Sequence, residues 1–475
     1  MKKLDIAVVG SGIGGSLIAS LNSDKNLVLF ERDRNLGGCA STFKRFGSYF
    51  NAGATTFVGY EKNHPIKEIF DKIDFKPDLL KSQVAIRTVQ NKKILDRTKD
   101  FDKFLEDINK IYPNKNNELF WKKLKQIDEK FWNLKKLYFA KYSLKAYIKS
   151  AIFVAELLKE FKFDIFKSAK GFIKETLGDI SDEYQNFIDA QLFITVQTTS
   201  KNIPLLSMAL GLSYPFHDVY YVNKGMGHIF DGILKSVNIH TKEEVLKIIR
   251  KNNEYLIRTN KDEYLSKNII LNSTVFDSSS FFEDEKIKNY YNSFKFNDQS
   301  AFVVYLKLDI KPELIHHYQI ILDENIPNCI SNSFFVSFSD VNDEVLSKKG
   351  LSVTISSHTK ANLWKEFNTK EYENKKFETM TYIIEEFLNN FDMINKNNIK
   401  SFFSATSTTF NSYINRFNCG GSAISIKNAF SLPSCKTPFK GLYNVGDTVF
   451  AGQGWPGVAL GVQVLNKELN EEFRT

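Results

Sequence analysis

The first thirty residues combine apolar runs with a glycine-rich turn. Residues 4–9 (LDIAVV) form a short apolar run, which is typical of a buried parallel strand. Glycines follow, then a helical pattern over 16–23 (SLIASLNS), and then a second apolar run over 27–30 (LVLF). This order predicts a strand–turn–helix–strand unit with both strands in one parallel sheet.

The turn after the first strand has the sequence GSGIGG, a G-x-G-x-x-G match that begins at Gly10. Gly10 permits the tight turn, Gly12 lets the backbone approach a diphosphate, and Gly15 allows the helix to pack closely on the strand. The N-terminus of the helix that follows offers N–H groups and the positive end of the helix dipole to phosphates, and we assign Ile13 and Gly14 to the same binding site. We therefore predict that a dinucleotide binds at this turn.

An acidic residue follows the second apolar run. Glu31 lies about 20 residues after the first glycine, where a carboxylate accepts hydrogen bonds from both ribose hydroxyls. An acid here favours a ribose without a 2′-phosphate, and it is compatible with both NAD and FAD. Arg32 comes next, and we assign it to the same binding site.

A second glycine pair lies just beyond this acid, at 37–38, and a further glycine segment (53–55) follows a hairpin pattern. Turn glycines in a surface hairpin are the alternative interpretation. The string E-R-x-x-x-x-G-G followed by G-A-T resembles the FAD-binding region of the phytoene desaturase and carotene isomerase family. That family belongs to the wider group of amine-oxidase-type flavoproteins, and the resemblance implies that the cofactor is FAD.

In that family the glycine pair lies against the FAD phosphates and ribityl chain, and the later segment passes near the flavin ring. By this resemblance the first role falls to Gly37, Gly38, Cys39, Ala40, Ser41 and Thr42, and the second to Gly53, Ala54 and Thr55. Many desaturases have arginine at the position of Cys39, so this chain departs from the commonest form of the motif.

The C-terminal part carries a second signature, GLYNVGD (441–447), followed by GQGWPG (452–457) and a helical pattern. The turn at 446–447 presents a carboxylate to a ribityl hydroxyl, and the helix N-terminus suits the pyrimidine edge of a flavin, where negative charge accumulates on reduction. A plain strand–helix connection is the alternative. The string also resembles the C-terminal signature of the same family. By that resemblance the FAD contacts are Gly446, Asp447, Trp455, Pro456, Gly457 and Val458.

Residues 219–276 combine a glycine turn, an amphipathic helix pattern, a hairpin pattern and a last apolar strand. They resemble the middle segment of the family, in which the backbone at Val245 packs against the adenine, and an ordinary β-meander is the alternative. The predicted fold is α/β, with a discontinuous Rossmann-like FAD-binding domain and an inserted mixed α+β substrate domain. The FAD-binding parts are 1–79, 219–289 and 401–475, and the substrate parts are 80–218 and 290–400.

Residues 131–166 have a helical pattern in which Phe, Tyr, Leu and Ile are interspersed with lysines. Two explanations stay open: an apolar, basic surface on an anionic membrane, and a solvated lysine face over an aromatic core. In the family a helical region here contacts the membrane and admits an apolar substrate. The resemblance therefore implies peripheral membrane contact.

Composition narrows the class of protein. The chain has 475 residues, of which 43% are hydrophobic and 25% charged, so it is globular. The formal charge of +9 suits an anionic cofactor or membrane surface and does not indicate nucleic acid. Four irregularly spaced cysteines and no metal-ligand spacing predict a reducing compartment and no metal site. No apolar run could span a membrane, so we expect a cytoplasmic protein, soluble or membrane-associated.

These features predict an FAD-dependent oxidoreductase that acts on an apolar, elongated substrate of carotenoid or other isoprenoid type, by hydride transfer to or from flavin N5. Three alternatives stay open: a reduced-flavin cis–trans isomerase without net redox change, an amine oxidase-like enzyme, and a non-catalytic FAD-binding protein. No side chain is singled out as a catalytic acid or base. The sequence gives no indication of the oligomeric state.

Overall fold

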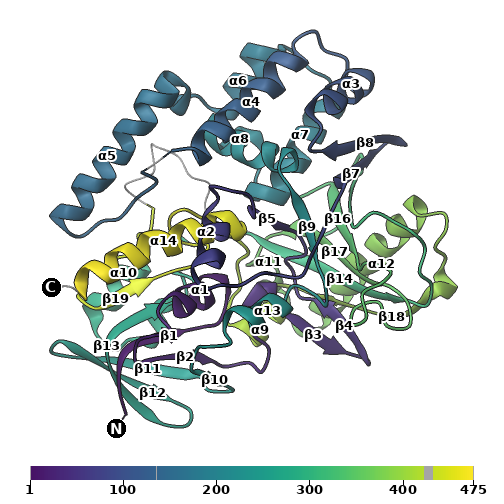
Figure 1. The fold of residues 1–475 in the computed structure, drawn as a ribbon. Helices are drawn as coiled ribbons and strands as arrows, with labels where there is room; N and C mark the ends of the chain where they lie inside the picture. The colour runs from purple at the N-terminus through teal and green to yellow at the C-terminus, as the bar shows by residue number, and fades with distance from the viewer. Residues whose placement is uncertain (1, 135, 422–431, 474–475) are drawn as a thin grey trace.

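The computed structural model describes residues 2–134, 136–421 and 432–473. Within them, the first sheet is seven-stranded, with the order β10-β2-β1-β13-β12-β11 and β19 beside β13. Its strands are β1 (Lys2–Val9), β2 (Leu27–Glu31), β10 (Ile239–Thr241), β11 (Val245–Lys251), β12 (Glu254–Thr259), β13 (Glu263–Leu271) and β19 (Leu442–Asn444). Three distant parts of the sequence therefore share one sheet, in the lower part of Figure 1.

The predicted strand–turn–helix–strand unit lies at the centre of this sheet and is confirmed. β1 pairs in parallel with both β2 and β13. The helix after the glycine turn, α1 (Ile13–Leu21), packs against the C-terminal helix α14 (Gly454–Glu472) in one hydrophobic core that includes Leu17 and Val462. The Rossmann-like α/β fold expected from the sequence is thus present, and both ends of the chain build it.

A second large sheet, also seven-stranded in the described chain, has the order β18-β14-β17-β16-β15-β7-β8. Its strands are β7 (Val84–Gln90), β8 (Lys93–Thr98), β14 (Ser300–Leu308), β15 (His317–Ile321), β16 (Ser333–Phe338), β17 (Ser352–Thr359) and β18 (Ile399–Ala405). The pair β15–β7 is parallel, whereas the other pairs are antiparallel. The long helix α12 (Thr369–Asn390) contributes Ile383 and Phe387 to the core of this sheet.

Two small sheets accompany the large ones. They are β3 (Thr42–Arg45) with β4 (Ser48–Asn51), and β9 (Val219–Val222) between β5 (Phe57–Val58) and β6 (Leu79–Lys81). Short helices lie between the strands of the large and small sheets. They are α2 (Pro65–Lys72), α9 (His228–Ile233), α10 (Glu285–Asn292), α11 (Leu363–Glu366) and α13 (Ser407–Ile414). β4 packs on β17, so the hairpin after the second glycine pair contacts the second large sheet.

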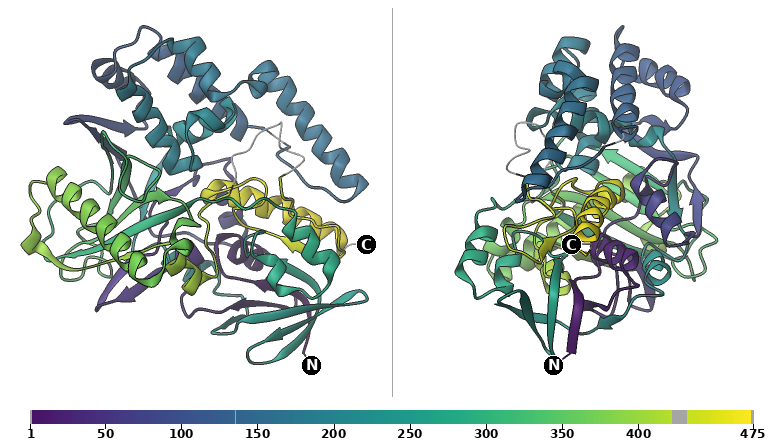
Figure 2. Two further views of the ribbon diagram at one scale, coloured as in Figure 1. Left: turned by 180° about the vertical axis from the view of Figure 1, so that it is seen from behind. Right: turned by 60° about the vertical axis from the view of Figure 1, so that its left-hand side comes forward.

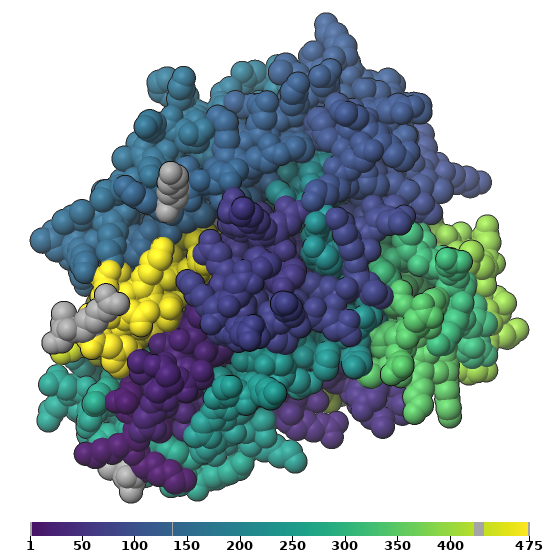
Figure 3. All heavy atoms as spheres, viewed as in Figure 1, coloured from purple at the N-terminus to yellow at the C-terminus, as the bar shows by residue number. Residues whose placement is uncertain are grey.

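A layer of helices covers the side of the molecule opposite β11 and β12 in all three ribbon views (Figures 1 and 2). It consists of α3 (Phe101–Ile111), α4 (Asn117–Trp132), α5 (Leu144–Phe161), α6 (Ala169–Leu177), α7 (Asp182–Val196) and α8 (Leu205–Ser213). Its core is aromatic: the rings of Phe104, Trp121 and Phe216 surround the guanidinium of the buried Arg97. In the space-filling view this layer lies above the C-terminal helix, which is yellow (Figure 3).

The helix predicted over 131–166 is wrong for its first part. α4 ends at Trp132, the described residues 136–142 form no regular structure, and α5 begins only at Leu144. Tyr142 has a φ of +67°, which a right-handed helix does not allow, and the Ser143 hydroxyl caps α5 by accepting a hydrogen bond from Ala146 N–H. No helix in the described ranges is long and apolar enough to cross a membrane.

Candidate functional site

The N-terminus of α1 is the centre of the candidate site. Gly10 has a φ of +95°, and its N–H donates to Phe30 O at 2.8 Å, which sets the turn. A β-carbon at Gly15 would lie 2.1 Å from Gly10 O, so only glycine fits there. Gly12 is the N-cap of α1, and no side chain caps the helix. The first N–H groups of α1 are therefore suited to an anionic ligand.

The end of β13 and the turn after β19 pack directly on this helix start. A β-carbon at Gly12 would lie 2.6 Å from Asn272 Nδ2, and one at Gly14 would lie 2.8 Å from Asn272 Oδ1 and 2.9 Å from Gly446 N. Ile13, the first residue of α1, lies between these glycines. The N-terminal and C-terminal signatures thus meet at one point.

The second glycine pair runs alongside the first turn. Gly37 N–H donates to Ser11 O at 3.1 Å, and Gly37 forms an isolated parallel bridge with Gly12. A β-carbon at Gly38 would lie 3.5 Å from Gly12 Cα. The chain then turns through the buried residues Ala40 and Ser41 into the β3–β4 hairpin.

Glu31 and Val245 lie at the opposite edge of the site. The Glu31 carboxylate accepts hydrogen bonds from Ser11 N–H at 2.9 Å and from the Ser11 hydroxyl at 2.6 Å. Arg32 Nη1 lies 3.3 Å from Glu244 Oε1, and Glu244 precedes Val245, a buried residue that begins β11. The middle segment is therefore joined to the acid that ends β2.

The predicted flavin-side segment 53–55 connects the site to the second sheet. Ala54 N–H donates to Cys39 O at 3.1 Å, and a β-carbon at Gly53 would meet the same oxygen at 3.4 Å. The Thr55 hydroxyl lies 2.7 Å from the Ser337 hydroxyl on β16. Thr55 therefore links the segment after the β3–β4 hairpin to the second large sheet.

Thr42 and Asn51 hold the middle glycine turn against the β3–β4 hairpin. The Thr42 hydroxyl donates to Asn51 Oδ1 and accepts from Gly227 N–H, both at 2.9 Å. Asn51 Oδ1 also accepts from Met226 N–H at 2.9 Å. The glycines at 225 and 227 thus contact the hairpin, because a side chain at either position would overlap Thr42.

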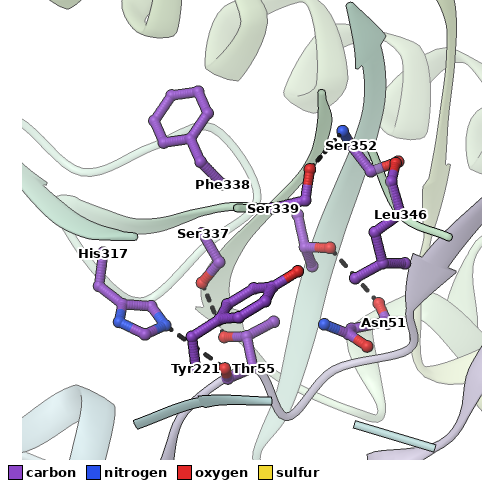
Figure 4. Close-up of a pocket in the computed structure, with 10 residues that line it drawn as sticks. Asn51, Thr55, Tyr221, His317, Ser337, Phe338, Ser339, Leu346 and Ser352 are labelled. Carbon is purple, nitrogen blue, oxygen red and sulfur yellow. Dashed lines mark hydrogen bonds between the residues drawn. The ribbon is translucent and has the colours of Figure 1, made fainter. Parts of the chain in front are cut away.

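A small polar cavity lies beside Thr55 and is lined by residues of β4, β9, β15 and β16 (Figure 4). The His317 ring has its Nε2 3.4 Å from Thr55 O, and its buried Nδ1 has no partner in the described chain. Burial lowers the pKa of His317 to about 3, so the ring is neutral. The Tyr221 hydroxyl donates to Asp343 Oδ2 at 2.7 Å, which orients its ring across the cavity.

The C-terminal loop supplies polar atoms without protein partners. Trp455 Nε1 and the Oε1 atoms of Gln197 and Gln453 are buried, and none has a hydrogen-bond partner within the part of the chain that the structure describes. A β-carbon at Gly420 would lie 2.2–2.3 Å from both glutamine oxygens, which places the two side chains together. Buried polar atoms of this kind are commonly satisfied by a bound ligand or water.

The first turn of α14 packs on neighbouring segments. Pro456 Cγ would lie 2.7 Å from a β-carbon at Gly59, and Gly457 approaches Gly452 O. Val458 is buried in the core below. Asp447, in the preceding loop, forms an ion pair with Arg416 at 2.8 Å.

The structure also brings together Glu61, His64 and His217, whose potential metal-ligand atoms lie within 4.8 Å of one another, although the sequence predicts no metal site. His217 Nδ1 lies 3.1 Å from Glu61 Oε2, and its Nε2 lies 2.5 Å from Asp128 Oδ2. Burial lowers the pKa of His217, but the hydrogen bonds to Asp128 and Glu61 outweigh it and raise the value to about 10. The ring is therefore a cation that joins α4 to the loops after β5 and before β9.

Sequence comparison finds one domain model and several distant relatives. A family model for an NAD(P)-binding Rossmann-like domain matches residues 8–73. A prolycopene isomerase of Daucus carota is 24% identical over 96% of this chain and 78% of its own length. The chain is thus similar, over nearly its whole length, to proteins named as prolycopene isomerases. An all-trans-retinol 13,14-reductase of Danio rerio is 31% identical over 141 residues, which are 27% of this chain and 23% of that protein.

Solved structures share the fold over nearly the whole chain. An oxidoreductase from Methanosarcina mazei has a TM-score of 0.62 at 18% identity and covers 98% of this chain and 100% of its own. A fatty acid isomerase from P. acnes that produces CLA has a TM-score of 0.61 at 13% identity, with 99% of both chains covered. The domain model indicates a dinucleotide-binding domain in this chain, and the relatives are named as isomerases and a reductase.

Several residues of the candidate site were not predicted from the sequence. Asn272 directly follows β13, and the rule that ligands bind at the carboxyl ends of parallel strands could have found it. Gln197 and Gln453 come from α7's end and the C-terminal loop, and they meet only in three dimensions. Arg416 likewise follows a short helix whose sequence gives no indication of a site.

Proposed function

We propose that this protein is a member of the phytoene desaturase and carotene isomerase family. It would bind FAD between the α1 N-terminus, residues 37–42 and residues 446–458, and act on an apolar, isoprenoid-like substrate. One observation carries the proposal: glycines from distant segments pack on a helix start that no side chain caps. The residues fit the cofactor, since the helix start suits a diphosphate and the unpartnered atoms of Gln197, Gln453 and Trp455 suit the polar edge of a flavin.

FAD, when bound, supplies hydride acceptance or donation at N5. The side chains near the C-terminal loop bind and orient. Their amide and indole groups donate or accept hydrogen bonds and keep their protonation states near neutral pH. We therefore assign positioning to Gln197, Gln453 and Trp455 and no proton transfer to any of them.

The helix α5 has apolar side chains on two opposite faces. This arrangement favours an apolar substrate and contact with a membrane surface. Phe153 and Leu157 are buried against the protein, whereas Leu144, Ile148 and Ile152 are 79%, 54% and 42% exposed. The exposed patch also includes Tyr142, Tyr147, Leu158, Phe163 and Phe166. Apolar side chains next to exposed lysines such as Lys145, Lys159 and Lys162 are typical of helices that lie on anionic bilayers.

The buried face of α5 leads to the candidate site. The rings of Phe139 and Phe153 lie 5.2 Å and 6.1 Å from the ring of Phe450. Phe450 begins the loop that carries Gln453 and Trp455. An apolar molecule taken from a membrane under α5 would therefore be delivered close to the C-terminal loop.

Isomerisation without net redox change is the second candidate function. The full-length relatives are named prolycopene isomerases, and those names favour a cis–trans reaction on a conjugated isoprenoid. The two functions differ in the fate of electrons. Desaturation reduces the flavin once per product, whereas isomerisation leaves the redox state of the flavin unchanged after each turnover.

The deciding experiment incubates purified, FAD-loaded protein with cis-configured and saturated isoprenoids without oxygen. Bleaching of the oxidised flavin with a new double bond in the product would support the oxidoreductase function, and conversion only with pre-reduced flavin would support the isomerase. Peroxide production with amines, or a flavin that no apolar compound ever reduces or uses, would contradict both.

A matched pair of variants tests the cofactor assignment. Glu31→Ala should weaken FAD binding roughly tenfold or more, because it removes the acceptor for the ribose hydroxyls and releases Ser11. Glu263→Ala removes an exposed carboxylate that accepts a hydrogen bond from Arg258 at the first residue of β13, at the far end of the sheet from the α1 N-terminus, and it should leave the Kd nearly unchanged. Titration of FAD into the apoprotein, followed by flavin fluorescence, measures both, and equal effects would contradict the assignment.

A further inference from the structure

Arg416 extends from the end of α13 into the candidate site. Its Nη2 donates to Asp447 Oδ2 at 2.8 Å, and its Nε donates to Asn418 O at 2.7 Å. The side chain is 13% exposed, and that of Asp447 is 22% exposed. Although burial lowers it, the ion pair with Asp447 raises the pKa of Arg416 above its usual range, so the guanidinium is charged.

The same guanidinium lies close enough to the Cys39 thiol to interact with it electrostatically. Cys39 and Asp447 belong to the two signatures at opposite ends of the chain. Each follows a glycine, Gly38 or Gly446, that packs on the start of α1. Arg416 therefore places a positive charge one residue away from both contacts around the helix N-terminus.

We propose that Arg416 is a further cofactor-binding residue, whose guanidinium binds the anionic diphosphate–ribityl part of FAD and joins the two signatures around it. The inference rests on the proposed function, because it takes FAD as the ligand. Asp447 alone would bring a second negative charge close to the diphosphate, and the repulsion would oppose binding. Arg416 compensates that charge and leaves donors for the ligand, since a guanidinium has five N–H groups and the protein uses two in the contacts above.

The segment 37–42 lacks a positive charge that Arg416 can supply. With Cys39, the segment 37–42 contains no cationic side chain. Arg416 reaches the same thiol from a distant part of the sequence, so the charge is supplied from another element.

The test measures the Kd for FAD and the thermal stability of four variants of the full chain. Arg416→Gln should raise the Kd roughly ten- to a hundredfold, because it removes charge-assisted hydrogen bonds to the ligand. Arg416→Lys should recover part of the loss. Cys39→Arg combined with Arg416→Gln should recover more than half of the lost binding, on a logarithmic scale, because it returns the charge to the same place.

Arg87→Gln is the matched control, because Arg87 binds Asp96 at 2.7 and 2.8 Å in the second sheet, outside the candidate site. Arg87→Gln should leave the Kd for FAD unchanged, although it should lower the stability of the apoprotein about as much as Arg416→Gln does. Equal Kd values for Arg416→Gln and wild type would overturn the inference, as would a double variant no better than Arg416→Gln. If Arg416→Gln does not fold, Arg416→Lys and the double variant decide. Wild-type protein that binds no FAD would instead refute the proposed function.

Discussion

At the scale of single residues, packing inside the protein requires some glycines of the candidate site without any ligand. A β-carbon at Gly14 would lie 2.8 Å from Asn272 Oδ1 and 2.9 Å from Gly446 N. We expect Gly14→Ala to lower the free energy of unfolding of the apoprotein by about 1–3 kcal/mol, because overpacking forces these segments apart. Gly53→Ala, whose β-carbon would meet only Cys39 O at 3.4 Å, is the control. Denaturant unfolding without FAD compares them, and equal stabilities would contradict this explanation.

Residues with a role in local backbone geometry could be predicted from the sequence, and residues defined by distant contacts could not. Gly10 and Glu31 lie where the motif places them, because a turn and a strand end are set by nearby residues. Arg416 and Gln197 have no such local signal. Their importance comes from side chains that reach Asp447 and Gly420 across the fold.

At the scale of elements, the charged network around His217 fixes the helical layer to the cofactor domain. Asp128 lies on α4 and is 2% exposed, and His217 supplies its counter-charge. We expect His217→Gln to lower the free energy of unfolding by roughly 3 kcal/mol, because it leaves a buried carboxylate without a cation. His228→Gln is the control, since the His228 side chain is 41% exposed and lies 3.6 Å from Asp231, whose side chain is 71% exposed. It should change stability by less than about 0.5 kcal/mol.

The same network predicts a pH dependence. The folded-state pKa of His217, about 10, lies above its ordinary value of 6.5. Its contribution is therefore complete below pH 6.5 and is lost as the pH rises through 10. The difference in unfolding free energy between wild type and His217→Gln should shrink between these two values, as measured by urea unfolding at several pH values. A difference that stays constant over this range would contradict the assignment of charge to His217.

The elements could be predicted where apolar residues recur with a clear period. The prediction was wrong where a turn interrupts an apolar run. The strands and helix of the first βαβ unit follow the expected pattern. Residues 136–142 are rich in apolar side chains but form no helix. The backbone of Tyr142 is in the left-handed region, and Ser143 caps the start of the next helix. Periodicity counts apolar positions and does not detect such a change in backbone direction.

At the scale of the whole molecule, the sequence indicated that distant segments share one dinucleotide site, but not how the inserted parts assemble. The parallel pair β7–β15 joins strands more than two hundred residues apart, and no local pattern marks them as partners. The position of α5 relative to α14 depends on contacts such as Lys149 with Glu468 and Glu471. These contacts leave the apolar outer face of α5 uncovered by the described chain.

That uncovered face leads to a prediction about the molecule on a bilayer. We expect the purified protein to co-sediment with vesicles that contain phosphatidylserine, and to do so less at high salt, because the lysines of α5 add an electrostatic attraction to apolar insertion. Leu144→Glu with Ile148→Glu should lower binding roughly a hundredfold, since each substitution removes about 1.5 kcal/mol or more of apolar burial. Phe377→Glu is the matched control, because Phe377 is 62% exposed on α12, the helix that packs on the second large sheet. Equal vesicle binding by the two variants would mean that α5 is not the contact surface, and the delivery of an apolar substrate through it would then be excluded.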